Sequence, residues 1–418
     1  MNIPATDSNV TKANIVWPFY AYATVAFFVA CLLLSFNSTL LLGHYFQPIL
    51  LSITHTMALA WGSMVIIGAT LQLLPVLTGK AIKEVKLAKF IFYLTSFSIP
   101  FIIYGFYHFV FGYVFFISAI LFIVGIIFLV WVVFQNAKSS ELIQVDYVLS
   151  ASIYLLITIL LGFLLALNFS YSVLPESSLH YLKLHAHLGI IGWFLFLIIG
   201  VGSKLIPMFF ISKYENQKLL KLIYYILHIS LLIFITSQTF INEKMLLYIS
   251  IIGIIISILM FIYFIWNSYK MRIKKHIDLA MRAAPFSKMM LLLGIGLLLF
   301  SFVLNDISIV VSYGFVVFFG WISLLILGMT FKTLPFIIWN DKFANSRDIK
   351  NPKDLYSAIL LKIMLMIYII GVVLTILGVL LKIKLIVLAS TYLLSIGAFL
   401  YLINVFKILF LTPKHVRE

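Results

Sequence analysis

The stretch His185–Phe209 reads HAHLGIIGWFLFLIIGVGSKLIPMF, and its spacing of special residues occurs three times in the chain. Counted back from Pro207, a glycine lies seven residues earlier and a tryptophan fourteen residues earlier. The same offsets from Pro75 and Pro335 complete the set Gly68, Gly200, Gly328 and Trp61, Trp193, Trp321. The prolines are 132 and 128 residues apart, which is far longer than the repeat of a solenoid protein. We therefore expect three related bundles of helices.

A histidine completes the pattern in only two of the three copies. His187 lies twenty residues before Pro207, and His55 lies twenty residues before Pro75. The corresponding residue of the third copy is Phe315. Two positions earlier, the three copies carry Ile53, His185 and Tyr313. The third copy thus keeps the proline, glycine and tryptophan but has no histidine at either position.

The composition indicates a membrane protein. Hydrophobic residues make up 64% of the 418 residues and charged residues only 10%. Apolar runs of about 20 residues occur throughout, and such runs cross a bilayer as helices, because a helix bonds its own backbone polar groups. We expect an all-α polytopic membrane protein of about twelve transmembrane helices in three pseudo-repeats of four. The expected spans are 17–41, 48–78, 88–108, 112–135, 147–170, 182–210, 219–240, 246–267, 288–304, 308–339, 356–381 and 385–411.

The chain is expected to form one membrane domain. We predict a cytoplasmic N-terminal tail at residues 1–16, a twelve-helix membrane domain at 17–411 and a cytoplasmic tail at 412–418. Residues 1–16 lack the basic start and the cleavage site of a signal peptide. The single cysteine, Cys31, excludes an internal disulfide and a metal site built on paired cysteines.

The net charge of +16 is distributed in a way that predicts the membrane topology. Lysine and arginine residues gather after each even-numbered span, and the longest basic segment is 270–288. Of the 29 basic residues, the four assigned to loops on the opposite face are Lys183, Lys244, Lys382 and Lys384. This positive-inside pattern places both termini in the cytoplasm and the protein in the inner (cytoplasmic) membrane. The basic surface is expected to face the anionic lipid bilayer, and a nucleic-acid partner is not expected.

The histidines inside the spans are the candidate functional residues. An ionisable side chain within a bilayer is costly and generally has a role, and imidazole nitrogen is a frequent ligand of haem iron and of copper. His55, His185 and His187 are therefore candidate cofactor and metal ligands, and His228 in the seventh span is a further candidate for a metal. His185 and His187 lie about 200° apart around a helix, so they would serve centres on opposite sides of it. The alternative is a structural role in which each histidine bonds to a neighbouring backbone carbonyl.

The second span resembles a known family. Its sequence LSITHTMALAWGSMVIIGATLQLLP (residues 51–75) is similar to the second helix of haem–copper oxidase subunit I, the cytochrome c oxidase subunit I family, especially in nitric oxide reductases and cbb3-type oxidases. In that family a histidine followed by a threonine ligates low-spin haem near the outer face, and His55–Thr56 matches this motif. The family's twelve helices, cytoplasmic termini and pseudo-threefold arrangement in arcs of four also resemble the organisation predicted here.

The chain departs from this family at most of the metal ligands. The two histidines of the family's tenth helix correspond to Tyr313 and Phe315, and the paired copper-binding histidines of the seventh helix are absent, leaving His228 alone. An HxH pair lies instead at His185 and His187, which is loosely similar to the NnrS haem- and copper-containing membrane proteins. The high-spin haem and its copper thus lack most of their expected ligands.

The resemblance implies a haem-binding membrane protein without a complete binuclear centre. We expect haem b, with copper as a second candidate cofactor, and a role in electron transport or in nitric oxide or oxygen handling. Any catalysis would be that of an oxidoreductase, and a redox partner or partner subunit is expected. The alternative from a different functional class is a transporter or channel for a small solute or metal ion.

Overall fold

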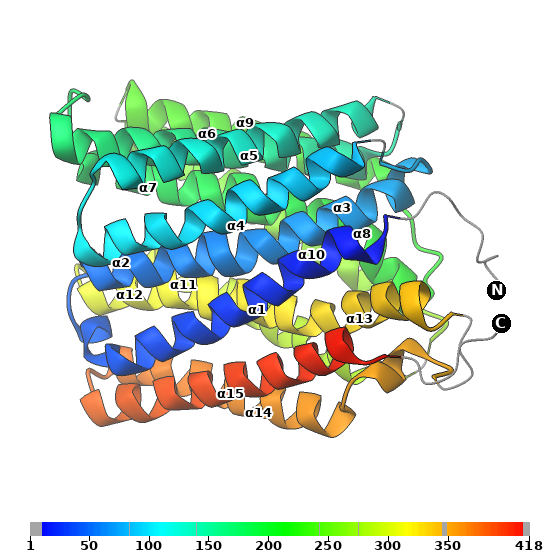
Figure 1. The fold of residues 1–418 in the computed structure, drawn as a ribbon. Helices are drawn as coiled ribbons and strands as arrows, with labels where there is room; N and C mark the ends of the chain where they lie inside the picture. The colour runs from blue at the N-terminus through cyan, green and yellow to red at the C-terminus, as the bar shows by residue number, and fades with distance from the viewer. Residues whose placement is uncertain are drawn as a thin grey trace. The chain divides into compact units, whose positions relative to one another are not determined.

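A computed structural model describes residues 11–412 apart from residues 83, 139, 242, 275 and 345–348 (Figure 1). The described residues are almost entirely helical, and the β-type pairing among them is one isolated antiparallel bridge between Ser212 and Arg272. The helices are α1 (Ala13–Phe36), η1 (Ser38–Leu42), α2 (Pro48–His55), η2 (Thr56–Ser63), α3 (Met64–Thr78), α4 (Val85–His108), α5 (Tyr113–Ala137), α6 (Ile143–Tyr171), α7 (Ser178–His187), η3 (Leu188–Leu195), α8 (Phe196–Phe210), α9 (Gln217–Thr239), α10 (Lys244–Lys270), η4 (Leu279–Arg282), α11 (Ala283–Ser301), α12 (Ile307–Phe315), η5 (Val316–Ile322), α13 (Ser323–Lys342), η6 (Pro352–Leu355), α14 (Ala358–Leu380) and α15 (Lys384–Phe410).

Within the described part of the chain, twelve continuous helices are long and apolar enough to cross a membrane. Eight of them are single α-helices, and four combine successive segments: α2–η2–α3, α7–η3–α8, η4–α11 and α12–η5–α13. The predicted all-α polytopic membrane fold is therefore confirmed, and the chain is an integral membrane protein.

The largest differences from the predicted spans are at the first and ninth helices. The first was expected at 17–41, but α1 begins at Ala13 and continues past Pro18, because Ile15 and Val16 in its first turn are buried. The ninth was expected at 288–304, but the helical chain begins at Leu279 and α11 ends at Ser301. Pro285 and the basic residues near it shorten the apolar run, yet a proline in the first turn of a helix removes no needed hydrogen bond.

The structure divides into two compact units, and each is described by itself. Among the described residues, the first unit comprises 11–72, 96–110 and 278–412, and the second comprises 73–95 and 111–277. In the first unit, α1 packs along α15, and α15 packs along α14. In the second unit, α6 packs against α5, η3 and α8, and α9 packs along α10. Helix α6 is thus a central element of the second unit.

The three spans that carry the repeated pattern share an unusual backbone. Each contains a π-helical segment, η2, η3 or η5, which begins nineteen residues before Pro75, Pro207 or Pro335. Each segment packs against the long helix that precedes its span in the chain, which is α1, α6 or α11. Segments with π-helical hydrogen bonds are rare and are often found at functional sites. The repeated sequence therefore corresponds to a repeated local structure.

The repeated glycines lie where these spans approach the preceding helix most closely. A Cβ atom on Gly68 would lie 2.8 Å from Cβ of Phe19, and one on Gly200 would lie 2.5 Å from Cβ of Tyr147. A Cβ atom on Gly328 would lie 2.6 Å from the carbonyl oxygen of Ala280. Small residues permit such close packing of membrane helices. The repeated tryptophans, Trp61, Trp193 and Trp321, are buried.

Candidate functional site

His55 and His187 occupy equivalent places in their spans. His55 is the last residue of α2, and His187 is the last residue of α7, so each immediately precedes a π-helical segment. The Nδ1–H group of His55 donates to the carbonyl oxygen of Leu51 at 2.7 Å. In the same way, Nδ1–H of His187 donates to the carbonyl oxygen of Lys183 at 2.8 Å. Both imidazoles therefore bond back to the residue one helical turn earlier.

This hydrogen bond determines which ring nitrogen keeps a lone pair. A carbonyl oxygen only accepts, so Nδ1 carries the proton and Nε2 is the basic nitrogen of each neutral ring. A histidine that binds a metal generally donates its other ring N–H to a carbonyl or carboxylate, which orients the ring. The donor chemistry of His55 and His187 therefore fits an axial ligand of haem iron, although the carbonyl bond alone is equally compatible with a structural histidine.

Aromatic side chains lie next to both rings. The imidazole of His55 stacks on Phe106, with ring centroids 3.9 Å apart and an interplanar angle of 12°. The ring of His187 lies 5.5 Å from that of Phe234 at an angle of 56°. Both histidines are half-buried. Stacking and the carbonyl bond together restrict the rotation of His55 more than that of His187.

His185 faces α6. Its Nδ1–H donates to the carbonyl oxygen of Thr158 at 3.1 Å, which leaves Nε2 as the basic nitrogen of this ring as well. Gly162, one turn further along α6, makes room for the imidazole, because a Cβ atom there would lie 2.7 Å from Cε1 of His185. His185 and His187 thus bond to different elements, as expected from their angular separation around α7.

His228 makes a different set of contacts. It lies on α9, where its Nδ1 is 2.8 Å from the hydroxyl of Tyr154 and its Nε2 is 3.2 Å from the hydroxyl of Ser150. The ring of Phe196 packs against it, with centroids 4.6 Å apart. Because both ring nitrogens take part in hydrogen bonds, His228 could ligate a metal only by giving up one of these partners.

The third copy of the pattern holds aromatic side chains at the two histidine positions. Phe315 is the last residue of α12, is buried and stacks on Phe319, with centroids 4.9 Å apart and an interplanar angle of 9°. Tyr313 is half-buried on the same helix. The π-helical segment that follows Phe315 is present even though the histidine is not.

The candidate ligands are divided between the two units. His55 belongs to the first unit, whereas His185, His187 and His228 belong to the second. Among the residues that the structure describes, no group of three or more His, Cys, Asp or Glu side chains could hold a metal ion. A haem iron, in contrast to most bare metal ions, needs no more than two protein ligands.

Sequence reasoning offered a carbonyl bond as the structural alternative for each histidine, but it did not identify the carbonyls and did not predict the π-helical segments. The carbonyl partners of the three histidines and the π-helical segments depend on backbone geometry, which spacing alone does not reveal. The contact of His185 with Gly162 has only a weak signal in the sequence. Thr158 and Gly162 are four residues apart, so they lie on one face of a helix.

No protein-family model matches this chain, and no curated protein matches it in sequence. The functional assignment therefore rests on the side chains and their contacts.

Proposed function

We propose that this integral membrane protein binds haem b, with His55, His185 and His187 as candidate axial ligands, and acts in electron transfer or in nitric oxide or oxygen handling. The proposal rests on two observations together: the common hydrogen bonding of the three histidines, and the equivalent positions of His55 and His187 immediately before a π-helical segment. Each of the three histidines donates Nδ1–H to a backbone carbonyl, so each keeps Nε2 as the basic nitrogen. Metal-binding histidines are oriented by such a bond, and structural histidines also make it, so the bond supports the proposal only together with the positions of the histidines.

The placement of the histidines adds support. His55 and His187 are at the same position of a pattern that includes a π-helical segment, and a shared function is a simple reason for their equivalence. Histidine within a bilayer is also uncommon without a role. Haem is the first candidate and copper the second, and the described residues include no group of three or more His, Cys, Asp or Glu side chains that could hold a metal ion.

The residues of the chain would position the cofactor in defined ways. Leu51, Lys183 and Thr158 supply the carbonyls that orient the imidazoles, and the ring of Phe106 holds His55 in one plane. A bound haem b would supply one-electron transfer, or a site for a diatomic gas if an axial position were open. Apolar surroundings at half-buried histidines would restrict the access of water to that site.

The deciding measurement is the reduced-minus-oxidised absorption spectrum of the purified full-length protein, with haem content determined on the same sample. We expect low-spin haem bands in the unaltered protein. The variants His55→Ala, His185→Ala and His187→Ala should identify the ligands, because loss of either axial ligand should abolish the low-spin signal. His180→Ala is the matched control, since His180 lies on α7 but is exposed.

Two outcomes would contradict the proposal. The unaltered protein could contain no haem, or all three histidine variants could keep an unaltered spectrum. Either result would make the histidines structural and would favour the transporter or channel alternative.

We also propose that both termini are cytoplasmic. An even number of spans supports two ends on the same side of the membrane, and the positive-inside pattern supports the cytoplasmic side. A fluorescent protein fused after Glu418 should therefore fold and fluoresce, whereas alkaline phosphatase fused there should be inactive. The opposite pair of results would reverse the orientation.

A further inference from the structure

A continuous chain of hydrogen-bonded side chains lies between α6 and α9 in the second unit. The hydroxyl of Tyr224 lies 2.8 Å from that of Ser150, and Oγ of Ser150 lies 3.2 Å from Nε2 of His228. On the other side of the ring, Nδ1 of His228 lies 2.8 Å from the hydroxyl of Tyr154. Four polar side chains, contributed alternately by the two helices, are thus joined by three direct hydrogen bonds.

Every member of this chain can both donate and accept a proton. Tyrosine and serine hydroxyls have one donor and free lone pairs, and a neutral imidazole has one nitrogen of each kind. In one arrangement Tyr224 donates to Ser150, Ser150 donates to Nε2 of His228, and Nδ1–H of His228 donates to Tyr154. When one proton binds to the hydroxyl of Tyr224, each member passes its own proton to the next, and Tyr154 releases one proton. Afterwards the direction of donation in all three hydrogen bonds is reversed. The transfer breaks and forms only O–H and N–H bonds, and no electrons are exchanged.

The chain leads inward from a charged entrance. Asp146 lies one turn before Ser150 on α6, and Lys221 lies one turn before Tyr224 on α9; both side chains are exposed. At the other end, Tyr154 is buried and packs against Gly192 in η3, where a Cβ atom would lie 2.7 Å from its own Cβ. Asp146 and Tyr154 are eight residues apart on α6, so the distance along the helix between them is about 12 Å.

Aromatic rings pack against His228. Phe196 packs against the imidazole with ring centroids 4.6 Å apart, and the ring of Tyr224 lies 4.4 Å from it at 70°. Asp146 interacts electrostatically with Lys221 and with Tyr224. A proton on the imidazole has the hydroxyls of Ser150 and Tyr154 as its immediate acceptors.

We infer that Tyr224, Ser150, His228 and Tyr154 form a proton-conducting chain from the membrane face that carries Asp146 to the level of η3. The inference does not depend on haem, because none of the four residues is a proposed axial ligand. It differs from a purely structural role, in which the same hydrogen bonds only hold α6 against α9. The two roles make opposite predictions about proton exchange at His228.

The test is nuclear magnetic resonance of the full-length protein labelled with ¹⁵N-histidine, reading the exchange of the His228 ring N–H proton with water. A His228→Asn variant identifies its signal by its disappearance. If the chain conducts, Ser150→Ala and Tyr224→Phe should each slow this exchange at least tenfold, because each interrupts the link to the entrance. Ser150→Thr keeps a hydroxyl at this position and should restore fast exchange.

Tyr147→Phe is the matched control. Tyr147 lies on α6 at the same helix pair, but its hydroxyl donates to the backbone carbonyl of Leu220 at 3.0 Å, so it is not part of the chain. This variant should leave exchange at His228 unchanged. Unchanged or faster exchange in both Ser150→Ala and Tyr224→Phe would overturn the inference, because a purely structural bond network loosens when a member is removed.

Discussion

The span α7–η3–α8 and the span α12–η5–α13 have the same framework and differ in the residue before the π-helical segment. Both have a buried tryptophan within the segment and a glycine in close contact with the preceding elements, followed by a proline. His187 ends α7, whereas Phe315 ends α12. Because the segment forms after either residue, its backbone is a property of the framework. The histidine is an addition to that framework and does not cause it.

The side chains of His187 and Phe315 also make their contacts in opposite directions along their helices. His187 donates back to the carbonyl of Lys183, four residues earlier, while Phe315 stacks forward on Phe319, four residues later. One arrangement orients a basic nitrogen, and the other buries apolar surface. The comparison therefore predicts that changes at His187 affect ligand binding and that changes at Phe315 affect stability.

The largest expected effect comes from replacing His187 with phenylalanine, the residue that the third copy has at the equivalent position. If His187 is an axial ligand, His187→Phe should lower haem content per folded protein at least tenfold, because phenylalanine has no donor nitrogen. The helical circular dichroism should be unchanged, since the third copy accommodates phenylalanine at this position. His180→Phe on the same helix should retain its haem. An unaltered haem spectrum in His187→Phe would leave His55 and His185 as the candidate ligands.

The next effect is on stability. Phe315→Ala removes a buried ring that stacks on Phe319, and such a truncation costs about 3–5 kcal/mol. Unfolding of the purified protein in a denaturing detergent should show a loss of this order, with haem content per folded protein unchanged. Stoichiometric loss of haem from a stable Phe315→Ala variant would show that the third copy takes part in cofactor binding.

The comparison also shows what sequence could predict. The pattern of proline, glycine and tryptophan marked the three spans that prove to share a π-helical segment, and apolar runs located the spans. The close contacts of Gly200 and Gly328 depend on the small size of glycine, which permits helices to approach closely.

Contacts between residues distant in sequence could not be predicted in this way. Lys332 forms an ion pair with Asp278, 54 residues earlier, and His228 is held by two hydroxyls of α6. A single sequence does not show which helices pack together. The chemistry of His228 was therefore interpreted as that of an isolated ligand, although the structure places it within a hydrogen-bonded chain.

A smaller effect should separate two glycines of the third copy. A Cβ atom on Gly328 would lie 2.6 Å from a backbone carbonyl oxygen, so Gly328→Ala requires a backbone shift that costs about 1–3 kcal/mol. A Cβ atom on Gly314 would have nothing within 4 Å, so Gly314→Ala should be neutral or should stabilise the helix by up to about 1 kcal/mol. Equal denaturation midpoints for the two variants would show that the third copy does not depend on the close approach at Gly328.

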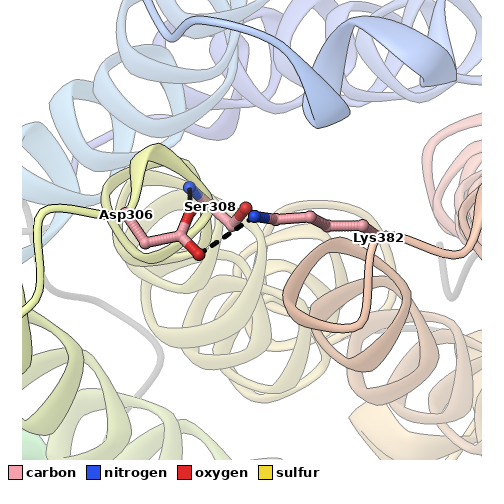
Figure 2. Close-up of polar contacts among 3 residues, drawn as sticks. All are labelled: Asp306, Ser308 and Lys382. Carbon is pink, nitrogen blue, oxygen red and sulfur yellow. Dashed lines mark hydrogen bonds and ion pairs between the residues drawn. The ribbon is translucent and has the colours of Figure 1, made fainter.

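The smallest expected effect is at the start of the third copy, where Asp306 precedes α12. Figure 2 shows its carboxylate accepting a hydrogen bond from the backbone N–H of Ser308, at 2.9 Å, and pairing with Lys382 at 3.1 Å. These interactions, the backbone bond first, lower the pKa of Asp306 below its ordinary value of 3.8. The carboxylate therefore contributes stability that is fully present above pH 3.8 and is lost as the pH falls through the lowered pKa. Because the pair is exposed, salt should weaken the contribution.

Asp306→Asn isolates this contribution, because asparagine still accepts the backbone hydrogen bond at the start of a helix but carries no charge. The difference in thermal midpoint between the unaltered protein and Asp306→Asn should be positive at pH 6 and should shrink toward pH 3 and at high salt. Other carboxylates titrate in both proteins, so only the difference between them reports on Asp306. A difference that does not change with pH would show that the charge of Asp306 does not stabilise the start of α12, and that the hydrogen bond to Ser308 is sufficient there.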